Sequence, residues 1–122
     1  NNRELHRQHI DQLASQVVRQ IEQSYADSDL SPTRIADSLG MSSAYLGRIF
    51  RESTQTSISQ YLNQTRIRRA EKLLRETEQP VETVAGLVGF SNPKYFYVVF
   101  KNITGQTPLQ FRKAVHSASK KN

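Results

Sequence analysis

Residues 84–111 read VAGLVGFSNPKYFYVVFKNITGQTPLQF, and residues 35–61 read IADSLGMSSAYLGRIFRESTQTSISQY. The two stretches carry similar residues, with an offset of 49 positions as far as Ser42 and Ser91 and of 50 beyond them. The matching positions are Ile35-Ala36 with Val84-Ala85, Leu39-Gly40 with Val88-Gly89, Ser42 with Ser91, Tyr45-Leu46 with Tyr95-Phe96, Phe50-Arg51 with Phe100-Lys101, and Gln60-Tyr61 with Gln110-Phe111. Each copy reads as a short helix, a tight glycine turn and a second helix, which is the order of a helix-turn-helix motif. The second copy has one extra residue in its turn.

Capping residues mark the helices of the first copy. Ser31-Pro32 predicts a helix start, because the serine oxygen accepts from free backbone N–H groups and proline at the first helical position gives up no useful hydrogen bond. This helix is expected to end at Gly40, since a positive φ costs glycine least. Ser42 is expected to cap the next helix, which runs to about Thr54. Ser57-x-x-Gln60 then forms a capping box, in which each side chain accepts from the other residue's backbone N–H.

One long helix is predicted between the two copies. Apolar spacing continues from Ser57 to about Thr77, and Pro80 stops the helix. The second copy repeats the signals of the first, with a helix over 81–88, a turn at Gly89, a cap at Asn92-Pro93, an end at Gly105 and a capping box at Thr107-x-x-Gln110. The expected core positions are Tyr45 or Leu46 with Ile49 and Phe50 in the first copy, and Leu87, Val88, Tyr95, Phe96, Val99, Phe100 and Phe111 in the second.

The N-terminal residues predict a further helix over 6–25, because apolar residues recur there at steps of three and four. Its apolar stripe is expected to pack on the first copy, although its glutamine-rich face could continue an upstream coiled segment. No sustained alternation of apolar and polar residues predicts a strand. We therefore predict an all-α chain of about seven helices, with two helix-turn-helix subdomains joined by a long linker helix. Its segments are the N-terminal helix (1–27), the first helix-turn-helix (28–56), the linker helix (57–78) and the second helix-turn-helix with a C-terminal helix and basic tail (79–122).

The positive charge lies in the second copy. Residues 1–82 hold eleven Lys or Arg and eleven Asp or Glu, whereas residues 83–122 hold six Lys or Arg and no acid, so the whole net charge of +6 lies there. Lys120 and Lys121 are expected to form a solvated basic end. The other four cations lie within predicted helices, where a surface that faces phosphate would need them: Lys94, Lys101, Arg112 and Lys113. A duplicated helix-turn-helix with this charge predicts two recognition helices for two stretches of DNA groove.

Composition argues against several other classes of protein. The chain has no cysteine, which excludes disulfides, thiolate metal sites and cysteine nucleophiles. It also lacks an apolar run of ~18 residues and a signal-peptide pattern, so we expect no membrane contact in this segment. His6 and His9 have no evident third metal ligand, and no serine lies in a catalytic motif, so we predict no catalytic residue, no metal and no cofactor. Because the chain begins at Asn1 and its one methionine is Met41, we expect it to be part of a longer polypeptide.

Four separated motifs resemble one family. Residues 66–74 read RIRRAEKLL, residues 88–96 read VGFSNPKYF, and Phe100-Lys101 and Gly105-Gln106-Thr107-Pro108 follow. Their order and spacing within residues 28–114 resemble the DNA-binding domain of the AraC/XylS family of bacterial transcription regulators. The resemblance implies two helix-turn-helix subdomains that place a recognition helix each into adjacent major-groove segments. A linker helix of 21 residues, from Ser57 to Thr77, would be roughly 30 Å long, which approaches the ~34 Å between successive major-groove turns.

The candidate base-reading residues of the first copy lie opposite its apolar face. The groove-facing positions are Ser43, Ala44, Gly47 and Arg48, and the resemblance places base readers at the last three. Arg48 has the strongest polar head and can take guanine O6 and N7 together, or it can contact phosphate or solvent instead. Gly47 reads nothing by itself but lets the backbone approach closely.

The matching positions of the second copy are Pro93, Lys94, Tyr97 and Val98. Members of the family often carry arginine where this chain has Val98, and valine can instead meet a thymine methyl group. Lys94 can read guanine or bind phosphate, whereas Tyr97 can do either or pack against the protein.

Phosphate anchors are expected to outnumber base readers. Three candidates are polar residues at helix starts, where backbone donors and the helix dipole favour anions: Ser42, Ser91 and Asn92. The other three are cationic side chains: Arg51, Lys101 and Arg112. Arg66, Arg68 and Arg69 are instead expected on the exposed face of the linker helix, where Arg68 can pair with Glu71 and Glu71 with Arg75.

One position departs from the family pattern. The family usually has glycine after the first recognition helix, as Gly105 is in the second copy, but this chain has Gln55. If the backbone there needs a positive φ, Gln55 costs about 1 kcal/mol relative to glycine.

Two other classes of function stay open from the sequence. A helical protein-interaction module would present its aromatic residues to a partner, whereas periodicity places them in the core. A sequence-neutral architectural DNA binder would contact phosphates as a regulator does, and it differs in the ratio of specific to non-specific affinity. The expected partner is double-stranded DNA, with RNA polymerase as a further candidate and any dimerisation through a missing region. The expected location is the bacterial cytoplasm, at the nucleoid when bound.

Overall fold

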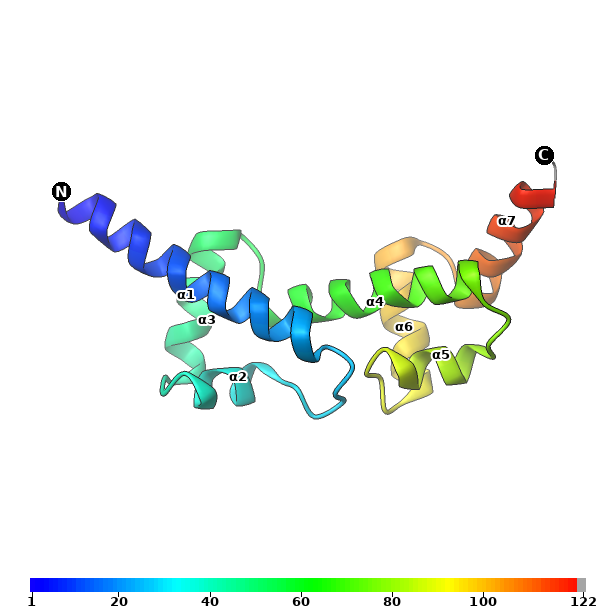
Figure 1. The fold of residues 1–122 in the computed structure, drawn as a ribbon, viewed down its shortest axis with the longest axis horizontal. Coiled ribbons are helices and arrows are strands. Elements are labelled where there is room, and N and C mark those ends of the chain that lie inside the picture. The colour runs from blue at the N-terminus through cyan, green and yellow to red at the C-terminus, as the bar shows by residue number, and fades with distance from the viewer. Residues whose placement is uncertain (121–122) are drawn as a thin grey trace. The chain divides into compact units, whose positions relative to one another are not determined.

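The computed structural model describes the backbone of residues 1–120 and the side chains of residues 1–118. Within this range the chain forms seven helices and no strand. Figure 1 shows the helices with their labels. They are α1 (Asn2–Ser24), α2 (Pro32–Ser38), α3 (Ser43–Thr54), α4 (Ile58–Glu76), α5 (Val81–Leu87), α6 (Pro93–Thr104) and α7 (Pro108–Lys120). The prediction of an all-α fold is confirmed. The one large difference in bounds is at α1, which starts four residues earlier than its apolar stripe indicates, because Asn1 caps it by accepting from Glu4 N.

The predicted caps form the helix starts. The side chains of Ser31, Ser42 and Asn92 each accept from a backbone N–H two or three residues later, at 2.9–3.3 Å. Both capping boxes are present, since Ser57 with Gln60 and Thr107 with Gln110 exchange hydrogen bonds at 2.9–3.2 Å. These bonds satisfy backbone donors that a helix cannot satisfy internally, so the helix starts are fixed by local sequence.

The turns of the two copies have the same structure as far as Met41 in the first copy and Phe90 in the second, after which the second copy has one extra residue. Met41 and Phe90 each donate from the backbone N to the carbonyl five residues earlier, at 2.9 Å in both turns. Beyond this point Ser42 caps α3 and Asn92 caps α6. Ser91 is therefore the extra residue of the second copy. The sequence pairs Ser42 with Ser91, but Asn92 has the equivalent structural role.

Contacts divide the chain into two compact units. Unit 1 consists of Asn1–Tyr25 with Asp29–Leu62, and unit 2 consists of Ala26–Ser28 with the residues from Asn63 onward. The first helix-turn-helix therefore lies in unit 1 with α1, and the second lies in unit 2. Helix α4 begins in unit 1 and ends in unit 2, so the predicted linker helix contributes to both.

Helix α1 supplies a large part of the core of unit 1. It lies across α3 in Figure 1 and packs against that helix. Buried side chains of α1, α2, α3 and the start of α4 form one cluster: Ala14, Val17, Ile21, Ile35, Ala36, Leu46, Phe50, Ile58 and Leu62. Ile10 and Leu13 of α1 also pack with Ile49 of α3. The prediction that the N-terminal helix packs on the first copy is confirmed.

The core of unit 2 is aromatic. Phe96 and Phe100 are fully buried, with ring centroids 5.7 Å apart, and Phe100 lies 5.6 Å from Phe111. Two positions that we expected in this core are wrong, because Tyr95 is 51% exposed and Leu87 is 49% exposed. A short helix buries only one narrow stripe of side chains, and each successive residue is rotated by about 100° around the helix axis. A residue next to a buried one, as Tyr95 is to Phe96 and Leu87 is to Val88, can therefore face outward.

The same geometry applies in unit 1. Of the alternatives Tyr45 and Leu46, the structure buries Leu46 completely and leaves Tyr45 39% exposed. Both tyrosines therefore lie beside the outward faces of α3 and α6, where side chains can meet a partner.

Candidate nucleic-acid interface

Helices α3 and α6 have the same distribution of buried and exposed side chains. Their inward faces match residue for residue, because Leu46, Ile49 and Phe50 of α3 are buried like Phe96, Val99 and Phe100 of α6. Their outward faces hold all eight residues that we predicted to face a groove. Six are exposed, namely Ser43, Ala44, Arg48, Pro93, Lys94 and Val98, and two are half-buried, namely Gly47 and Tyr97. Each helix is thus anchored by apolar packing on one side and presents the other side.

The outward face of α3 carries one strong hydrogen-bond donor. The Arg48 guanidinium lies 5.4 Å from the centroid of the Tyr45 ring. A cation over an exposed aromatic face gains about 0.5–1 kcal/mol, so this contact restricts the arginine before any partner binds. An added Cβ at Gly47 would meet no atom within 4 Å. Packing within the protein therefore does not demand glycine there, while the missing side chain leaves the helix backbone open to close approach.

The outward face of α6 is less polar at the corresponding position. Val98, which corresponds to Arg48, is 56% exposed, although it is apolar. Lys94 and Tyr97 lie on the same face, where they line a shallow hollow together with Asn92, Pro93 and Glu82.

Tyr95 connects α6 to α4 within unit 2. Its hydroxyl accepts from Asn63 Nδ2 at 3.1 Å, and its ring lies 5.9 Å from that of Phe90. These contacts hold the first turn of α6, where Lys94 and Pro93 lie. Sequence reasoning missed this role because it placed Tyr95 in the core.

Five of the six predicted phosphate anchors are exposed polar or cationic side chains. They are Ser42, Arg51, Ser91, Asn92 and Lys101. Ser42 and Asn92 also cap their helices. Arg112 differs from the others, because its Nε donates to the Leu74 carbonyl at 3.1 Å and its Nη2 donates to the Thr77 carbonyl at 3.2 Å. Its half-buried guanidinium thus stabilises the C-terminal end of α4.

Arg66 is not on the exposed face of α4, where we expected it. It is only 7% exposed, its Nη2 donates to the Asp27 carbonyl at 2.9 Å, and its guanidinium lies 5.6 Å from the centroid of Phe90. Burial lowers the pKa of Arg66, while the charges of Asp27 and Tyr95 act in the opposite direction. The helical spacing could have shown this position, because Leu62, Arg66 and Ala70 follow one another at steps of four on one buried stripe.

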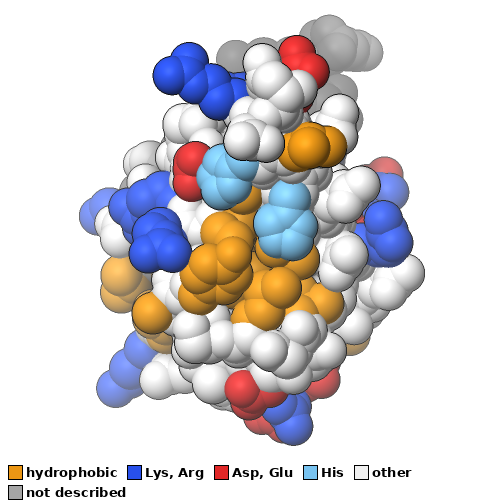
Figure 2. Space-filling model, turned by 90° about the vertical axis from the view of Figure 1, so that its left-hand side faces the viewer, with side chains coloured by type: hydrophobic (Ala, Val, Ile, Leu, Met, Phe, Trp, Pro, Cys, Tyr) orange, Lys and Arg blue, Asp and Glu red, His pale blue; other side chains and the backbone are white. Residues whose placement is uncertain are grey.

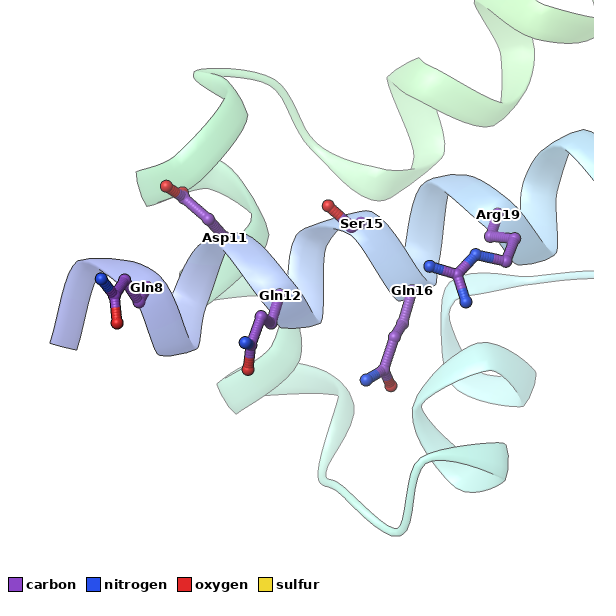
Figure 3. A pocket seen from close by; sticks show the side chains of 6 residues that line it. All are labelled: Gln8, Asp11, Gln12, Ser15, Gln16 and Arg19. Carbon is purple, nitrogen blue, oxygen red and sulfur yellow. The ribbon is translucent and has the colours of Figure 1, made fainter. Parts of the chain in front are cut away.

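Unit 1 also has hollows beside its N-terminal helix, away from the outward face of α3. A hollow on α1 is lined by Gln8, Asp11, Gln12, Ser15, Gln16 and Arg19, which all come from that one helix (Figure 3). Figure 2 shows two histidine side chains over a group of hydrophobic side chains. His6 Nε2 lies 3.7 Å from Glu52 Oε1.

Across the part of the chain that the structure describes, no three His, Cys, Asp or Glu side chains are grouped to hold a metal, and no helix is both long and apolar enough to cross a bilayer.

Two tandem helix-turn-helix units with cationic outward faces define a DNA-binding domain, and comparison with known proteins agrees. A family model described as a helix-turn-helix domain matches residues 35–114. The chain belongs to this family, whose members include the AraC/XylS regulators. A curated relative, the Msm operon regulatory protein of Streptococcus mutans serotype c, is 37% identical over 100 residues, which are 82% of this chain and 36% of that protein. The chain thus spans about a third of the length of this relative.

Solved structures have the same fold. The C-terminal domain of AraT, a response regulator from Geobacillus stearothermophilus, is 29% identical with a TM-score of 0.81, and the match covers 84% of each chain. The DNA-binding domain of the global transcriptional factor AdpA, solved in complex with a target DNA, is 26% identical with a TM-score of 0.79. That match covers 90% of this chain and 97% of the AdpA domain.

Proposed function

We propose that this chain recognises a specific double-stranded DNA site by placing α3 and α6 in adjacent major-groove segments, and that it directs a longer transcription regulator to that site. One observation carries the proposal: α3 and α6 repeat the same buried and exposed positions, so each presents a matching outward face. The AdpA domain, which has the same fold, binds a target DNA. The basic second copy supplies the charge that such binding needs.

Base reading is assigned to the outward faces of α3 and α6. Arg48 takes guanine through O6 and N7, and Gly47 and Ala44 let the helix lie close to the base edges. Ser43 lies at the start of the same face. On α6, Lys94 reads guanine, Val98 meets a thymine methyl group, and Pro93 and Tyr97 shape the surface around them.

Phosphate contacts position the two helices. Arg51 and Lys101 occupy equivalent places at the C-terminal halves of α3 and α6, and Ser42, Ser91 and Asn92 lie at the N-terminal ends, where helix dipoles favour anions. We leave Arg112 out of this set, because its guanidinium already donates to two carbonyls at the end of α4.

The linker helix has a suitable length for this arrangement. Helix α4 has 19 residues, so it is roughly 28 Å long at 1.5 Å per residue. Successive major-groove turns are separated by ~34 Å. We therefore infer that the bound site consists of two short blocks about one helical turn apart, read by one copy of the chain.

The wider role belongs to the longer protein. We propose that it works in the bacterial cytoplasm, at the nucleoid when bound, and that it contacts RNA polymerase through faces of this chain that do not touch DNA. Any dimerisation would use a region outside this chain; about two thirds of the Msm operon regulatory protein lies outside its match to this chain.

Selection of bound duplexes from a random pool tests the proposal. The expected result is two conserved blocks spaced near one helical turn, each bound far more tightly than scrambled DNA. Arg48→Ala should then lose about 1–3 kcal/mol at one base pair, whereas Lys101→Ala should weaken binding to all duplexes alike. A pool without conserved positions would favour a sequence-neutral architectural binder. Equal losses on selected and scrambled DNA for both variants would overturn the assigned roles.

A further inference from the structure

Glu82 lies among the residues that the proposed function assigns to DNA. It is in the first turn of α5 and lines the hollow whose other walls are Asn92, Pro93, Lys94 and Tyr97 of α6 and its cap. Its side chain is exposed. It is also the last acidic residue of the chain, since residues 83–122 contain six Lys or Arg and no Asp or Glu. Glu82 thus directly precedes the basic residues 83–122 in sequence and shares a hollow with the start of the recognition helix α6.

A carboxylate at this place would be repelled by DNA phosphates unless it has a partner there. Among the residues that the structure describes, neither Glu82 nor Lys94 takes part in an ion pair. The fold therefore does not use the charge of either side chain in a salt bridge, and both remain able to meet groups on a ligand in the hollow.

A structural role for Glu82 is the competing explanation. The N-cap residue of α5 is Pro80, which makes no side-chain capping hydrogen bond, and Glu82 is the acidic residue of the first turn. A negative charge there stabilises the helix dipole. This role needs only a charge near the helix start. It does not require the carboxylate to share a hollow with Lys94 and Tyr97.

The chemistry of the hollow matches one base pair. Lys94 is a pure donor and Glu82, when ionised, is a pure acceptor. In the major groove, guanine presents two acceptors, O6 and N7, and its paired cytosine presents the N4 amine as a donor. A lysine and a carboxylate that line one hollow are therefore complementary to the two halves of a G·C pair. An adenine–thymine pair places thymine O4, an acceptor, and a methyl group where the cytosine amine would be.

We propose that Glu82 is a specificity-determining residue, whose carboxylate accepts a hydrogen bond from cytosine N4 while Lys94 contacts the guanine of the same base pair. The inference rests on the proposed function, because it needs α6 in the major groove. It adds a reader from α5, a helix to which the sequence pattern assigns no base contact.

The test measures binding of the chain to duplexes in which each base pair of the selected α6 block is changed in turn. The wild-type chain should prefer G·C at one position by about 5- to 150-fold, the range of one good side-chain contact. Glu82→Gln keeps the size and removes the charge but leaves an amide oxygen as an acceptor, so it should reduce the preference for cytosine there and leave the preferences at other positions unchanged. Thr33→Ala is the matched control, because Thr33 is the exposed residue at the equivalent position of α2, and it should change no preference.

Three outcomes would overturn the inference. If Glu82→Gln tightens binding to every duplex alike, the carboxylate only repels phosphate. If it lowers the melting temperature and leaves all preferences intact, the carboxylate serves the α5 dipole. If the lost preference is for adenine, the base assignment is wrong. Failure of the proposed function looks different, since the wild-type chain would then show no preference among duplexes at all.

Discussion

The guanidinium of Arg66 donates to the backbone carbonyl of Asp27 at 2.9 Å, so a charged side chain of α4 holds the segment between α1 and α2 within unit 2. A buried cation is costly unless it is compensated, and the lowered pKa of Arg66 reflects its desolvation, with Asp27 acting against that shift. The Phe90 ring adds a cation–π contact at 5.6 Å. Arg66 therefore stabilises a connection that no apolar side chain could make, because only a donor satisfies the Asp27 carbonyl.

Replacement of Arg66 by methionine should destabilise the protein. Methionine fills a similar volume and removes the desolvated charge, but it leaves the Asp27 carbonyl without this donor. We expect a loss of about 1–3 kcal/mol in the free energy of unfolding, measured by urea titration. Lys72→Met, at an exposed position of the same helix, should stay within about 0.5 kcal/mol of wild type. Equal effects of the two variants would show that burial of Arg66 has no energetic role.

The loss from Arg66→Met should not depend on pH near neutrality. A folded-state pKa below the unfolded value makes stability rise with pH only above the folded-state pKa, where the unfolded chain binds more protons. Arginine stays protonated in both states between about pH 5 and pH 9, so its desolvation cost is constant across that range. Urea titrations of wild type and variant at both ends of the range should give the same difference, and a difference that grows toward pH 9 would contradict this, because the folded-state pKa would then lie within the range.

The turns after α3 and α6 differ at one residue in the left-handed region. Gln55 has φ 61° and Gly105 has φ 82°, and each accepts this conformation as the C-cap of its helix. The neighbouring threonines act alike: the hydroxyls of Thr54 and Thr104 each lie 2.8 Å from the carbonyl four residues earlier. The two turns thus have the same structure with different residues. Because Gln55 has a positive φ, it carries the backbone strain that the sequence predicts for this angle.

Gln55→Gly should stabilise the protein by about 1 kcal/mol or less, because glycine removes the strain of a positive φ. The gain is reduced by the loss of the hydrogen bond from Gln55 Nε2 to the Glu52 carbonyl. Gly105→Ala is the reciprocal variant and should destabilise by about 1 kcal/mol, although an added Cβ would meet no atom within 4 Å there. Midpoints of urea unfolding measure both. A destabilised Gln55→Gly variant would mean that the side-chain hydrogen bond outweighs the backbone strain.

Much of the fold could be predicted because its signals are local. A cap such as Ser31 and a capping box such as Thr107 with Gln110 involve residues at most three positions apart, so the sequence alone contains the whole interaction. The same holds for the candidate readers on α3 and α6, which follow from helical spacing opposite an apolar stripe. Their contact with DNA stays a prediction.

What could not be predicted depends on contacts between distant residues. Tyr95 is aromatic and adjacent to Phe96, yet its hydroxyl meets Asn63 of α4, 32 residues away in sequence. Glu82 shares a hollow with Lys94 only because α5 and α6 pack together. The basic region predicts Arg112 as a phosphate anchor, and only the structure shows that its guanidinium donates to two carbonyls at the end of α4. Charge alone does not tell whether a side chain faces a partner or the protein's own carbonyls.

The role of Arg112 can be separated from that of a phosphate anchor. Arg112→Ala should lose about 1–3 kcal/mol of stability, since two carbonyls at the end of α4 lose a charged donor. It should leave the salt dependence of DNA binding unchanged. Lys101→Ala should do the reverse, with little change in stability and a salt slope smaller by about 1. Thermal unfolding and affinities over a salt series measure the two effects, and a reduced salt slope for Arg112→Ala with unchanged stability would return Arg112 to the interface.

Val98 tests whether an apolar side chain reads a base on α6. It is 56% exposed, so the fold gains little from its apolar surface, and a thymine methyl group is the apolar feature of the major groove. Val98→Ala should weaken binding to the selected site by about 0.5–1 kcal/mol, the value of roughly one buried methylene, with stability unchanged. Replacement of the contacted thymine by deoxyuridine, which lacks only the methyl group, should weaken wild-type binding by a similar amount and have little further effect on the variant. The contrary result is that the losses in binding free energy from Val98→Ala and from the deoxyuridine replacement add fully at every thymine of the block. In that case Val98 and the methyl group do not touch, and α6 reads its site through Lys94 and its neighbours alone.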